Sequence, residues 1–388
     1  MATMKNLMSM LDDIPGVVTE EMIEKAYLEG VRHPSPSFNA IFGNTHCIPS
    51  GASACFWGPF KGGKTYSLNA MIGQLHKDDE DAVAIKFDTE MREQFQMTPR
   101  MLASYGIDSK RYRAIQTNKP DEIFDFIENK LPAFIQKGMK IKLVGIDSIN
   151  EIMGRRAMNT DTVMTQQIGD EAATIKDGLK RIRATLRRYG VTLIMIAQER
   201  DELDQLEIMR GRKKKMAGAN ALKHFAEFFI RIEPNQAADG RIDALGVPLL
   251  NKDKEPFAHK IKMIMQYNSL GPRGRTGEFT LNYNKGIVST NEEVSNLAIK
   301  YGAVERPNNR SYIVKNFPSE GKEIKFSSLA DWLAGIAQNE DLAKELVRRV
   351  RARDIDLMNN GIKEDEALPP ELEDPELEAV AETVDENA

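Results

Sequence analysis

The chain has 388 residues, 41% of them hydrophobic, and this length predicts two or three structural domains. No run of about 18 apolar residues occurs, and the amino terminus lacks the basic-then-apolar layout of a secretory signal. We therefore expect no contact with membranes and a location in the cytoplasm, of the host if the protein is viral. The two cysteines, Cys47 and Cys55, argue against a disulfide framework or a structural zinc site.

The formal net charge of −5 is unevenly distributed along the chain. Residues 364–388 contain eleven acidic side chains and no basic one, so the rest of the chain is net basic. We expect residues 361–388 to form a disordered acidic tail, because prolines stand among the acids and few apolar side chains are available for a core. The tail either competes with an anionic partner for basic loops or serves only as a solubilising extension.

Residues 1–36 combine a short amphipathic pattern around Glu20–Leu28 with a proline-containing break, and we interpret them as an N-terminal segment outside the core. From residue 37 to about residue 290, apolar strand-like runs alternate with helical periods. The first five runs are Ala54–Trp57, Ala82–Phe87, Tyr112–Gln116, Ile141–Ile146 and Thr192–Ala197. This alternation predicts an α/β core whose mostly parallel central sheet is flanked by helices.

The pattern changes after residue 227. Three strand-like segments are expected to extend the same sheet with antiparallel strands: Phe228–Ile232, His259–Tyr267 and Gly277–Tyr283. Residues 291–360 then combine helix-like and strand-like stretches, and the last stretch is predicted as one helix through 326–353. We expect residues 291–360 to form a small α+β domain.

The segment Gly58–Thr65 matches the pattern G-x-x-x-x-G-K-[ST], directly after a strand-like run and directly before a helical stretch. In this context backbone N–H groups and a helix N-terminus surround phosphates, Lys64 reaches the β and γ oxygens, and the Thr65 hydroxyl can hold Mg²⁺. The sequence therefore predicts a site for ATP and Mg²⁺ formed by Gly58, Pro59, Phe60, Lys61, Gly62, Gly63, Lys64 and Thr65.

Three further strand-like runs end in polar side chains. Asp147 ends the run that begins at Ile141, in the position where a Walker B carboxylate binds the magnesium's water shell. Glu90 follows another run and is a candidate general base that orients water, with Asp88 as the alternative. Gln198 follows the run Thr192–Ala197, where an amide can hydrogen-bond a γ-phosphate and report its presence to the next segment.

The connection from Gln198 to about Gly218 is too long for an ordinary loop between a strand and a helix. It contains a basic cluster that suits contact with nucleic-acid phosphates. Acidic residues precede the cluster, so a solvated charged surface is the alternative interpretation. The cluster consists of Arg210, Arg212, Lys213, Lys214 and Lys215.

Several segments resemble the RecA recombinase family, in the same order along the chain. Ala217–Ala226 is similar to the G-G-N-A-L-K-F-Y-A stretch that closes the family's second DNA-binding loop, and Ile168–Asp170 matches the end of its first loop. Within the family, the phage UvsX-type proteins resemble this chain most, through Phe87–Glu90 and the run from Thr98 to Asp108. Other matching landmarks, over about residues 37–355, are Ile48–Gly51, Asp147-Ser148, Gly277–Phe279 and Ala330–Leu333.

The resemblance implies a DNA-dependent ATPase that forms a helical filament on single-stranded DNA and pairs it with homologous duplex DNA. It implies Glu90 as the catalytic carboxylate acting with Lys64, and Gln198 as the sensor that couples ATP to the second loop. The two DNA-binding loops are expected at about 154–168 and 199–218. Their candidate DNA contacts are Arg155, Arg156, Arg210, Arg212, Lys213, Lys214, Lys215 and Asn220.

Members of this family bind ATP between neighbouring subunits, and the resemblance implies that residues 1–36 pack on the next subunit. The family's two trans-acting lysines fall near Gln266 and Asn268, where this sequence differs, and Arg273 or Arg275 are candidate substitutes. A mediator and a single-strand-binding protein are further expected partners. Two alternatives stay open, a RecA-like hexameric helicase and a mediator paralogue that lacks strand exchange.

Overall fold

The computed structural model describes two long stretches, 17–154 and 170–360, with short gaps at 202–208, 210–213, 217–221, 223, 238–239, 244–248, 250–255, 283 and 289. The chain divides into two compact units, Met1–Thr290 and Asn291–Ala388. None of the helices within these described stretches is long and apolar enough to cross a membrane.

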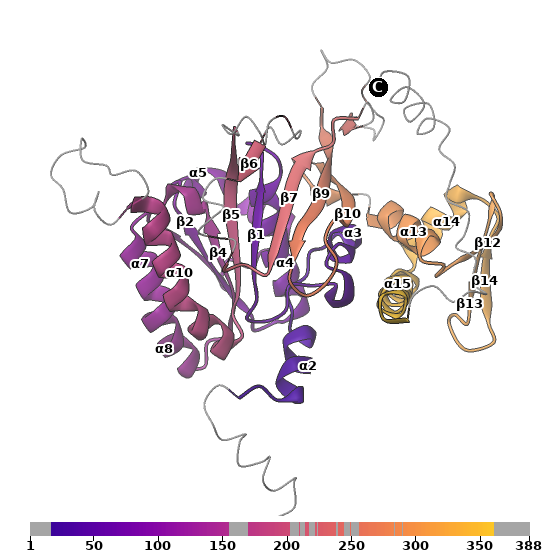
Figure 1. Ribbon diagram of the computed structural model, residues 1–388. Coiled ribbons are helices and arrows are strands. Elements are labelled where there is room, and N and C mark those ends of the chain that lie inside the picture. Colours follow the sequence, from indigo (N-terminus) through magenta and orange to yellow (C-terminus); the bar gives the residue numbers. More distant parts are fainter. Residues whose placement is uncertain are drawn as a thin grey trace, which may run out of the picture. The chain divides into compact units, whose positions relative to one another are not determined.

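The first unit is an α/β structure (Figure 1). Its helices are α2 (Glu20–Leu28), α3 (Pro36–Ala40), α4 (Lys64–Asp78), α5 (Glu93–Gln96), α6 (Pro99–Tyr105), α7 (Pro120–Asp125), the π-helical η2 (Phe126–Lys130), α8 (Leu131–Gln136) and α10 (Asp170–Tyr189), with short 3₁₀ turns η1 (Gly43–Thr45) and η3 (Ile149–Glu151). Its strands are β1 (Ser53–Gly58), β2 (Val83–Asp88), β3 (Tyr112–Gln116), β4 (Ile141–Asp147), β5 (Thr192–Asp201), β6 (Lys214–Met216), β7 (Phe228–Pro234), β8 (Arg241–Ile242), β9 (Ala258–Asn268), β10 (Thr276–Asn282) and β11 (Gly286–Val288).

These strands form one sheet in the order β11-β10-β9-β7-β1-β5-β4-β2-β3, with β6 paired to β5 and β8 paired to β9. The strands from β7 to β3 in this order run parallel. β9, β10 and β11 extend the sheet beyond β7 in antiparallel pairs. The predicted α/β class with a mostly parallel sheet is confirmed, and so is the antiparallel extension.

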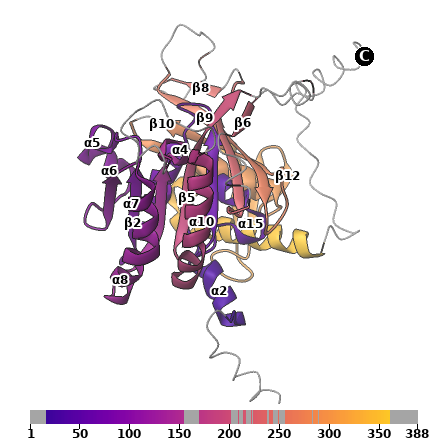
Figure 2. The same ribbon diagram turned by 60° about the vertical axis from the view of Figure 1, so that its left-hand side comes forward.

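The central strands are apolar on both faces because helices cover both. Along β1, Ala54 and Phe56 belong to the hydrophobic cluster that includes the buried side of α4. Cys55 and Trp57 belong to a second cluster, formed with α7, α8 and α10. Neighbouring residues of a strand point to opposite faces, so a continuous apolar run serves two cores at once. Figures 1 and 2 show α7, α8 and α10 on one face of the sheet.

The second unit contains α13 (Thr290–Lys300), β12 (Glu305–Asn308), β13 (Ser311–Lys315), β14 (Glu323–Phe326), α14 (Leu329–Gln338) and α15 (Glu340–Asn360). The three strands form a separate antiparallel sheet in the order β12-β13-β14. Its core is built around Trp332, which is fully buried and stacks on Tyr312 with ring centroids 5.3 Å apart.

The prediction of one helix through 326–353 is wrong. Phe326 ends β14, and the helical part is divided into α14 and α15 at Asn339. Asn339 has extended backbone angles, and its side-chain oxygen accepts the Leu342 N–H at 3.0 Å. An asparagine in this conformation ends one helix and caps the next, because it satisfies an N–H that has no partner within its own helix.

Candidate active site

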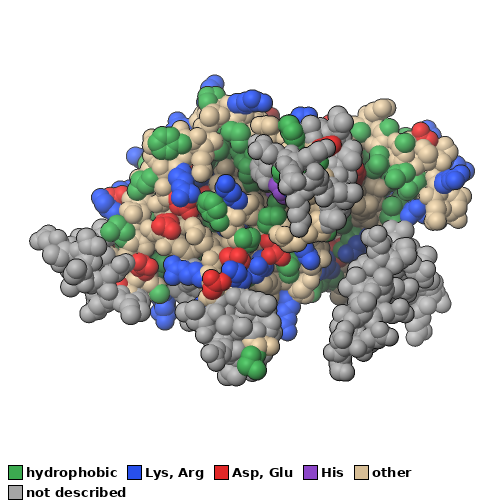
Figure 3. Space-filling model, turned by 90° about the horizontal axis from the view of Figure 1, so that it is seen from above, with side chains coloured by type: hydrophobic (Ala, Val, Ile, Leu, Met, Phe, Trp, Pro, Cys, Tyr) green, Lys and Arg blue, Asp and Glu red, His purple; other side chains and the backbone are tan. Residues whose placement is uncertain are grey.

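The predicted nucleotide-binding residues follow strands that are neighbours in the sheet. β1, β5, β4 and β2 are adjacent in that order. Gly58 is in register with Gln198, and Asp88 is in register with Asp147. Because the carboxyl ends of parallel strands meet at one edge of a sheet, residues that are distant in sequence are brought together there. In the space-filling view of Figure 3, Lys, Arg, Asp and Glu side chains are interspersed with apolar ones.

The P-loop depends on two glycines. Gly58 has φ 144° and Gly63 has φ 97°. Both values lie in a range that residues with a Cβ atom rarely adopt. A Cβ on Gly58 would lie 2.2 Å from the carbonyl oxygen of Ile232 on β7, so no other residue fits there. Gly63 caps α4, and the helix therefore begins at Lys64 with the N–H groups of its first turn next to the loop, as an anion site requires.

Lys64 is buried within this loop. Its ammonium donates to the carbonyl oxygen of Gly58 at 3.0 Å and to that of Pro59 at 2.6 Å. Burial lowers the pKa of Lys64, and the negative charges of Asp147 and Glu199 act in the opposite direction. The ammonium is thus held by neutral carbonyl oxygens, and the oxygens of a phosphate would be stronger partners for it.

Thr65 and Asp147 form the part of the site that fits a metal ion. The Thr65 hydroxyl donates to Oδ2 of Asp147 at 2.9 Å. Burial raises the pKa of Asp147, and the ammonium of Lys86 is the largest influence against that shift. A hydroxyl and a carboxylate are the kinds of oxygen donor that Mg²⁺ takes in sites where phosphates and water complete its shell. In the described part of the chain, no group of three or more His, Cys, Asp or Glu side chains could hold a metal by itself.

Glu90 is held from two sides. Its Oε1 accepts the side-chain N–H of Gln198 at 3.0 Å, and its Oε2 lies 2.9 Å from a guanidinium nitrogen of Arg92. The backbone N–H of Gln198 donates to Oδ1 of Asn150 at 2.8 Å, which fixes β5 at this point. The residue predicted as base and the residue predicted as sensor are therefore direct hydrogen-bond partners.

Asp88, the alternative base, has a different environment. It is buried, and its Oδ2 accepts the backbone N–H of Glu93 at 2.6 Å and the side-chain N–H of Gln116 at 3.0 Å. These contacts connect the end of β2 to the start of α5 and to the end of β3. Such a carboxylate holds neighbouring backbone in place, whereas Glu90 faces the sensor residue.

A buried polar group beneath this edge was not predicted from the sequence. Lys86 on β2 forms an ion pair with Glu93, and the carboxylate of Glu93 also accepts the hydroxyl hydrogen of Tyr112. A signal was available, because a lysine in the middle of an apolar strand requires a buried partner. Asn150 and Arg92 were missed as well. The contact of Asn150 with Gln198 depends on which strands are neighbours. Arg92 lies only two residues after Glu90, but the direction of its side chain is set by the local fold and leaves no pattern in the sequence.

The predicted DNA contacts are described only in part. Lys214 and Lys215 are exposed on β6, which pairs with β5 just beyond Gln198, and Lys214 forms an ion pair with Asp201 at 2.7 Å. β6 is therefore attached directly to the end of β5, the strand that carries Gln198. The remaining candidates lie outside the described residues, namely Arg155, Arg156, Arg210, Arg212, Lys213 and Asn220.

The positions considered for trans-acting cations have contacts within the first unit. Gln266 accepts the indole N–H of Trp57 at 2.9 Å. Asn268 donates to the carbonyl oxygen of Phe42 at 3.3 Å, and Arg275 donates to that of Ala40 at 3.0 Å.

Comparison with known proteins identifies the family of this chain. Residues 21–288 match the RecA N-terminal domain family. The chain is 20% identical over 329 residues to Protein RecA of Campylobacter fetus subsp. fetus, a match that covers 83% of each chain. It is 24% identical over 304 residues, 78% of each chain, to Protein RecA of Mycoplasma mycoides subsp. mycoides.

A third relative, Protein RecA of Nostoc sp., is 22% identical over 240 residues, which are 62% of this chain and 60% of that relative. The family match covers well over half of the chain and includes every strand that contributes to the site. The chain therefore belongs to the RecA N-terminal domain family.

Proposed function

We propose that this protein is an ATP-dependent DNA recombinase, which hydrolyses ATP while it is assembled as a filament on single-stranded DNA. The observation that carries the proposal is the 3.0 Å hydrogen bond between Glu90 and Gln198. It joins a carboxylate suited to activating water to an amide on β5, the strand that pairs with the basic strand β6. This connection favours a nucleotide switch coupled to nucleic acid over an isolated nucleotide-binding fold.

In the proposed reaction, the P-loop and Lys64 bind the phosphates of ATP. Thr65 and Asp147 hold Mg²⁺, which neutralises phosphate charge when it is bound. Glu90 orients a water molecule and accepts its proton. The water oxygen bonds to the γ-phosphorus while the bond from that phosphorus to the bridging oxygen breaks, and ADP and phosphate are the products.

The proposed sensor acts by exchanging hydrogen-bond partners. Gln198 donates its side-chain N–H to Glu90 in the structure, and a γ-phosphate oxygen would compete for the same donor. When Gln198 turns to the phosphate, Oε1 of Glu90 becomes free to accept from water. Because β5 continues to Asp201 and pairs there with β6, the rearrangement is transmitted to Lys214 and Lys215.

The proposed partners are single-stranded DNA, homologous duplex DNA and further copies of this chain. The two loops at about 154–168 and 199–218 bind DNA, and each phosphate that they neutralise makes affinity more sensitive to salt. The protein acts in recombination, repair and recombination-dependent replication in the cytoplasm, as a phage UvsX-type recombinase does. A mediator and a single-strand-binding protein assist loading.

Negative-stain imaging of the full chain tests filament assembly. With single-stranded DNA and a non-hydrolysable ATP analogue, we expect helical filaments that disappear when either component is omitted. A Lys64→Ala variant should form no filaments that depend on the analogue. Closed rings would indicate a hexameric helicase instead, and isolated particles would exclude filament assembly.

A strand-exchange assay separates a recombinase from a mediator paralogue. Circular single-stranded DNA is incubated with linear duplex DNA and ATP, and joint molecules are resolved by gel electrophoresis. We expect joint molecules with homologous duplex and none with heterologous duplex. Filaments without joint molecules would favour the mediator function.

A further inference from the structure

Arg92 contacts the proposed base but has no assigned role. It lies two residues after Glu90, at the N-cap position of α5. A guanidinium nitrogen of Arg92 lies 2.9 Å from Oε2 of Glu90, while the side-chain N–H of Gln198 lies 3.0 Å from Oε1. The two oxygens of one carboxylate therefore have different partners.

The ion pair between Arg92 and Glu90 differs from an ordinary surface pair. Exposed pairs contribute little, because water screens them and both side chains lose rotamer freedom. Here the Glu90 side chain is only 19% exposed, while that of Arg92 is 50% exposed. The carboxylate is the more enclosed partner, and a charged donor at one of its oxygens restricts how it can rotate.

The backbone that carries Arg92 is anchored by the next residue. Glu93 is buried, and its carboxylate pairs with Lys86 and accepts the hydroxyl hydrogen of Tyr112. Its backbone N–H donates to Oδ2 of Asp88 at 2.6 Å. These contacts fix the start of α5, so the Arg92 side chain extends from a fixed point toward Glu90.

We propose that Arg92 is a positioning residue for Glu90. It holds Oε2, so that Oε1 alone exchanges between Gln198 and the attacking water. Once Gln198 has left, Oε1 still points to the same place, and the water meets a base that is already oriented. The inference rests on the proposed function, because it requires that Glu90 acts on water.

The test compares ATP turnover of the full chain and its variants, with single-stranded DNA present. We expect Arg92→Ala to lower kcat by about 10- to 100-fold and to change KM for ATP by less than about twofold, because a misplaced base affects the transition state more than binding. Arg92→Lys should recover part of the loss, since it still supplies one charged donor. Arg181→Ala is the matched control. It removes another partly exposed ion pair of the first unit, between Arg181 and Glu128, and should leave kcat unchanged.

A double-mutant cycle shows whether Arg92 acts through Glu90. In the Glu90→Gln background, Arg92→Ala should cause no further loss of kcat. An equal loss in both backgrounds would mean that Arg92 acts on the phosphates directly, and this would overturn the inference, as would wild-type kcat in Arg92→Ala. Loss of affinity for an ATP analogue in Arg92→Ala would also overturn it. If Glu90→Gln itself turns over like the wild type, the proposed function is wrong rather than the role of Arg92 alone.

Discussion

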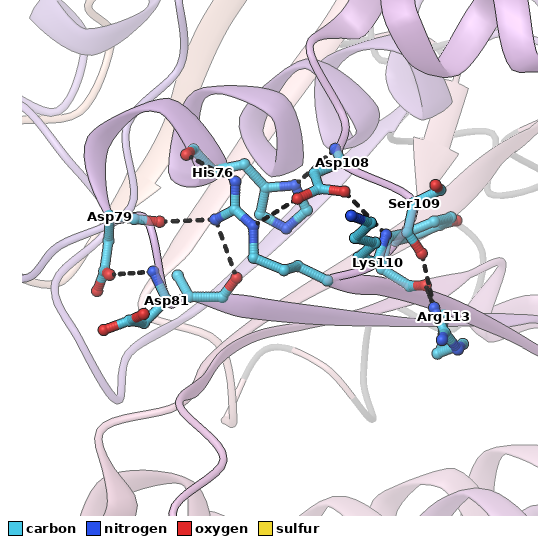
Figure 4. A network of polar contacts seen from close by, with 10 residues as sticks. His76, Asp79, Asp81, Asp108, Ser109, Lys110 and Arg113 are labelled. Carbon is cyan, nitrogen blue, oxygen red and sulfur yellow. Dashed lines mark hydrogen bonds and ion pairs between the residues drawn. The ribbon is translucent and has the colours of Figure 1, made fainter.

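The two ends of α4 carry polar groups with different tasks. At the amino end, Lys64 donates to carbonyl oxygens of the loop, and Thr65 donates to the Asp147 side chain. Phosphate oxygens can replace the carbonyl oxygens as partners of Lys64, and a metal ion can replace the hydrogen bond between Thr65 and Asp147. At the carboxyl end, Arg111 donates to the backbone carbonyl oxygens of His76 at 3.1 Å and Asp79 at 2.8 Å. Figure 4 shows His76, Asp79 and Asp108 within this network of polar contacts.

Arg111 is itself held in place at this carboxyl end. Its Nε lies 3.0 Å from Oδ2 of Asp108, and the backbone N–H of Asp108 donates to Nδ1 of His76 at 3.1 Å. The last carbonyl oxygens of a helix lack hydrogen-bond donors within the helix, and Arg111 donates to two of the carbonyl oxygens at this end. The comparison teaches that the side chains at one end of a helix can exchange hydrogen-bond partners while the other end is held in place. Here the carboxyl end is held by hydrogen bonds to the loops before β2 and β3.

The largest effect on activity is expected at the amino end. Lys64→Ala removes the cation that the loop holds for phosphate, so turnover should fall by about 10³-fold or more while the melting temperature changes little. Steady-state hydrolysis and thermal unfolding measure the two quantities. Lys77→Ala, an exposed lysine at the other end of the same helix, is the control and should retain wild-type turnover. Near-normal turnover of Lys64→Ala would show that the amino end of α4 does not bind the phosphates of ATP through Lys64.

Glu90→Gln should keep ATP bound and lower hydrolysis by about 10²- to 10⁴-fold, because the amide cannot accept a proton from water. Asp88→Asn provides the contrast. Asp88 holds the start of α5, so its variant should lose stability more than activity. Single-turnover hydrolysis, with nucleotide binding measured separately, distinguishes the Glu90→Gln variant from the Asp88→Asn variant. The opposite result, with Asp88→Asn inactive and Glu90→Gln active, would reassign the base.

Arg111→Ala should act on stability alone. It removes the donor to the carbonyl oxygen of His76 and one of two donors to that of Asp79, and we expect a loss of about 2–4 kcal/mol in the free energy of unfolding with KM for ATP unchanged. Urea unfolding provides the measurement. Arg113→Ala is a matched control, because that guanidinium is bonded only to nearby carbonyl oxygens of Ser109 and Tyr112 in the described structure. An Arg111→Ala protein with the wild-type free energy of unfolding but slow ATP hydrolysis would contradict the division of tasks between the two ends of α4.

The smallest effect is a loss of stability in acid at the carboxyl end. Burial, together with the Arg111 cation, lowers the pKa of His76 below 6.5, and burial lowers the pKa of His33 to about 3. The unfolded chain then binds more protons than the folded chain below pH 6.5. Stability from both residues is complete above that pH and is lost as the pH falls, for His33 toward about 3.

Urea unfolding at about pH 7 and about pH 5 tests this dependence. His76→Gln keeps an acceptor for the Asp108 N–H but cannot titrate, so it should lose less stability between the two conditions than the wild type does. His33 remains in that variant and contributes to the residual loss. Equal losses in both proteins would exclude His76 as an acid-sensitive part of the network.

Local patterns were sufficient for the fold class and for part of the site. The alternation of apolar runs with helical periods predicted the parallel sheet, because a strand covered by helices on both faces must be apolar throughout. The P-loop could be recognised from Gly58–Thr65 alone, since its backbone conformations depend on glycine at fixed spacing. The division of the last helices at Asn339 was missed, because apolar periodicity continues through a capping residue.

What the sequence by itself determined was therefore the set of strand-terminal side chains that meet at one edge. The tertiary structure alone decided which of them touch: Glu90 with Gln198 and Arg92, but Asp88 with the start of α5. For Glu90 and Gln198 the physical reason is strand order: β4 lies between β2 and β5 in the sheet, and contacts between strands that are distant in the chain leave no periodic signal in the sequence of either one. For Arg92 and for the start of α5 it is the conformation of the turn after β2, which directs side chains that are near in sequence to different partners.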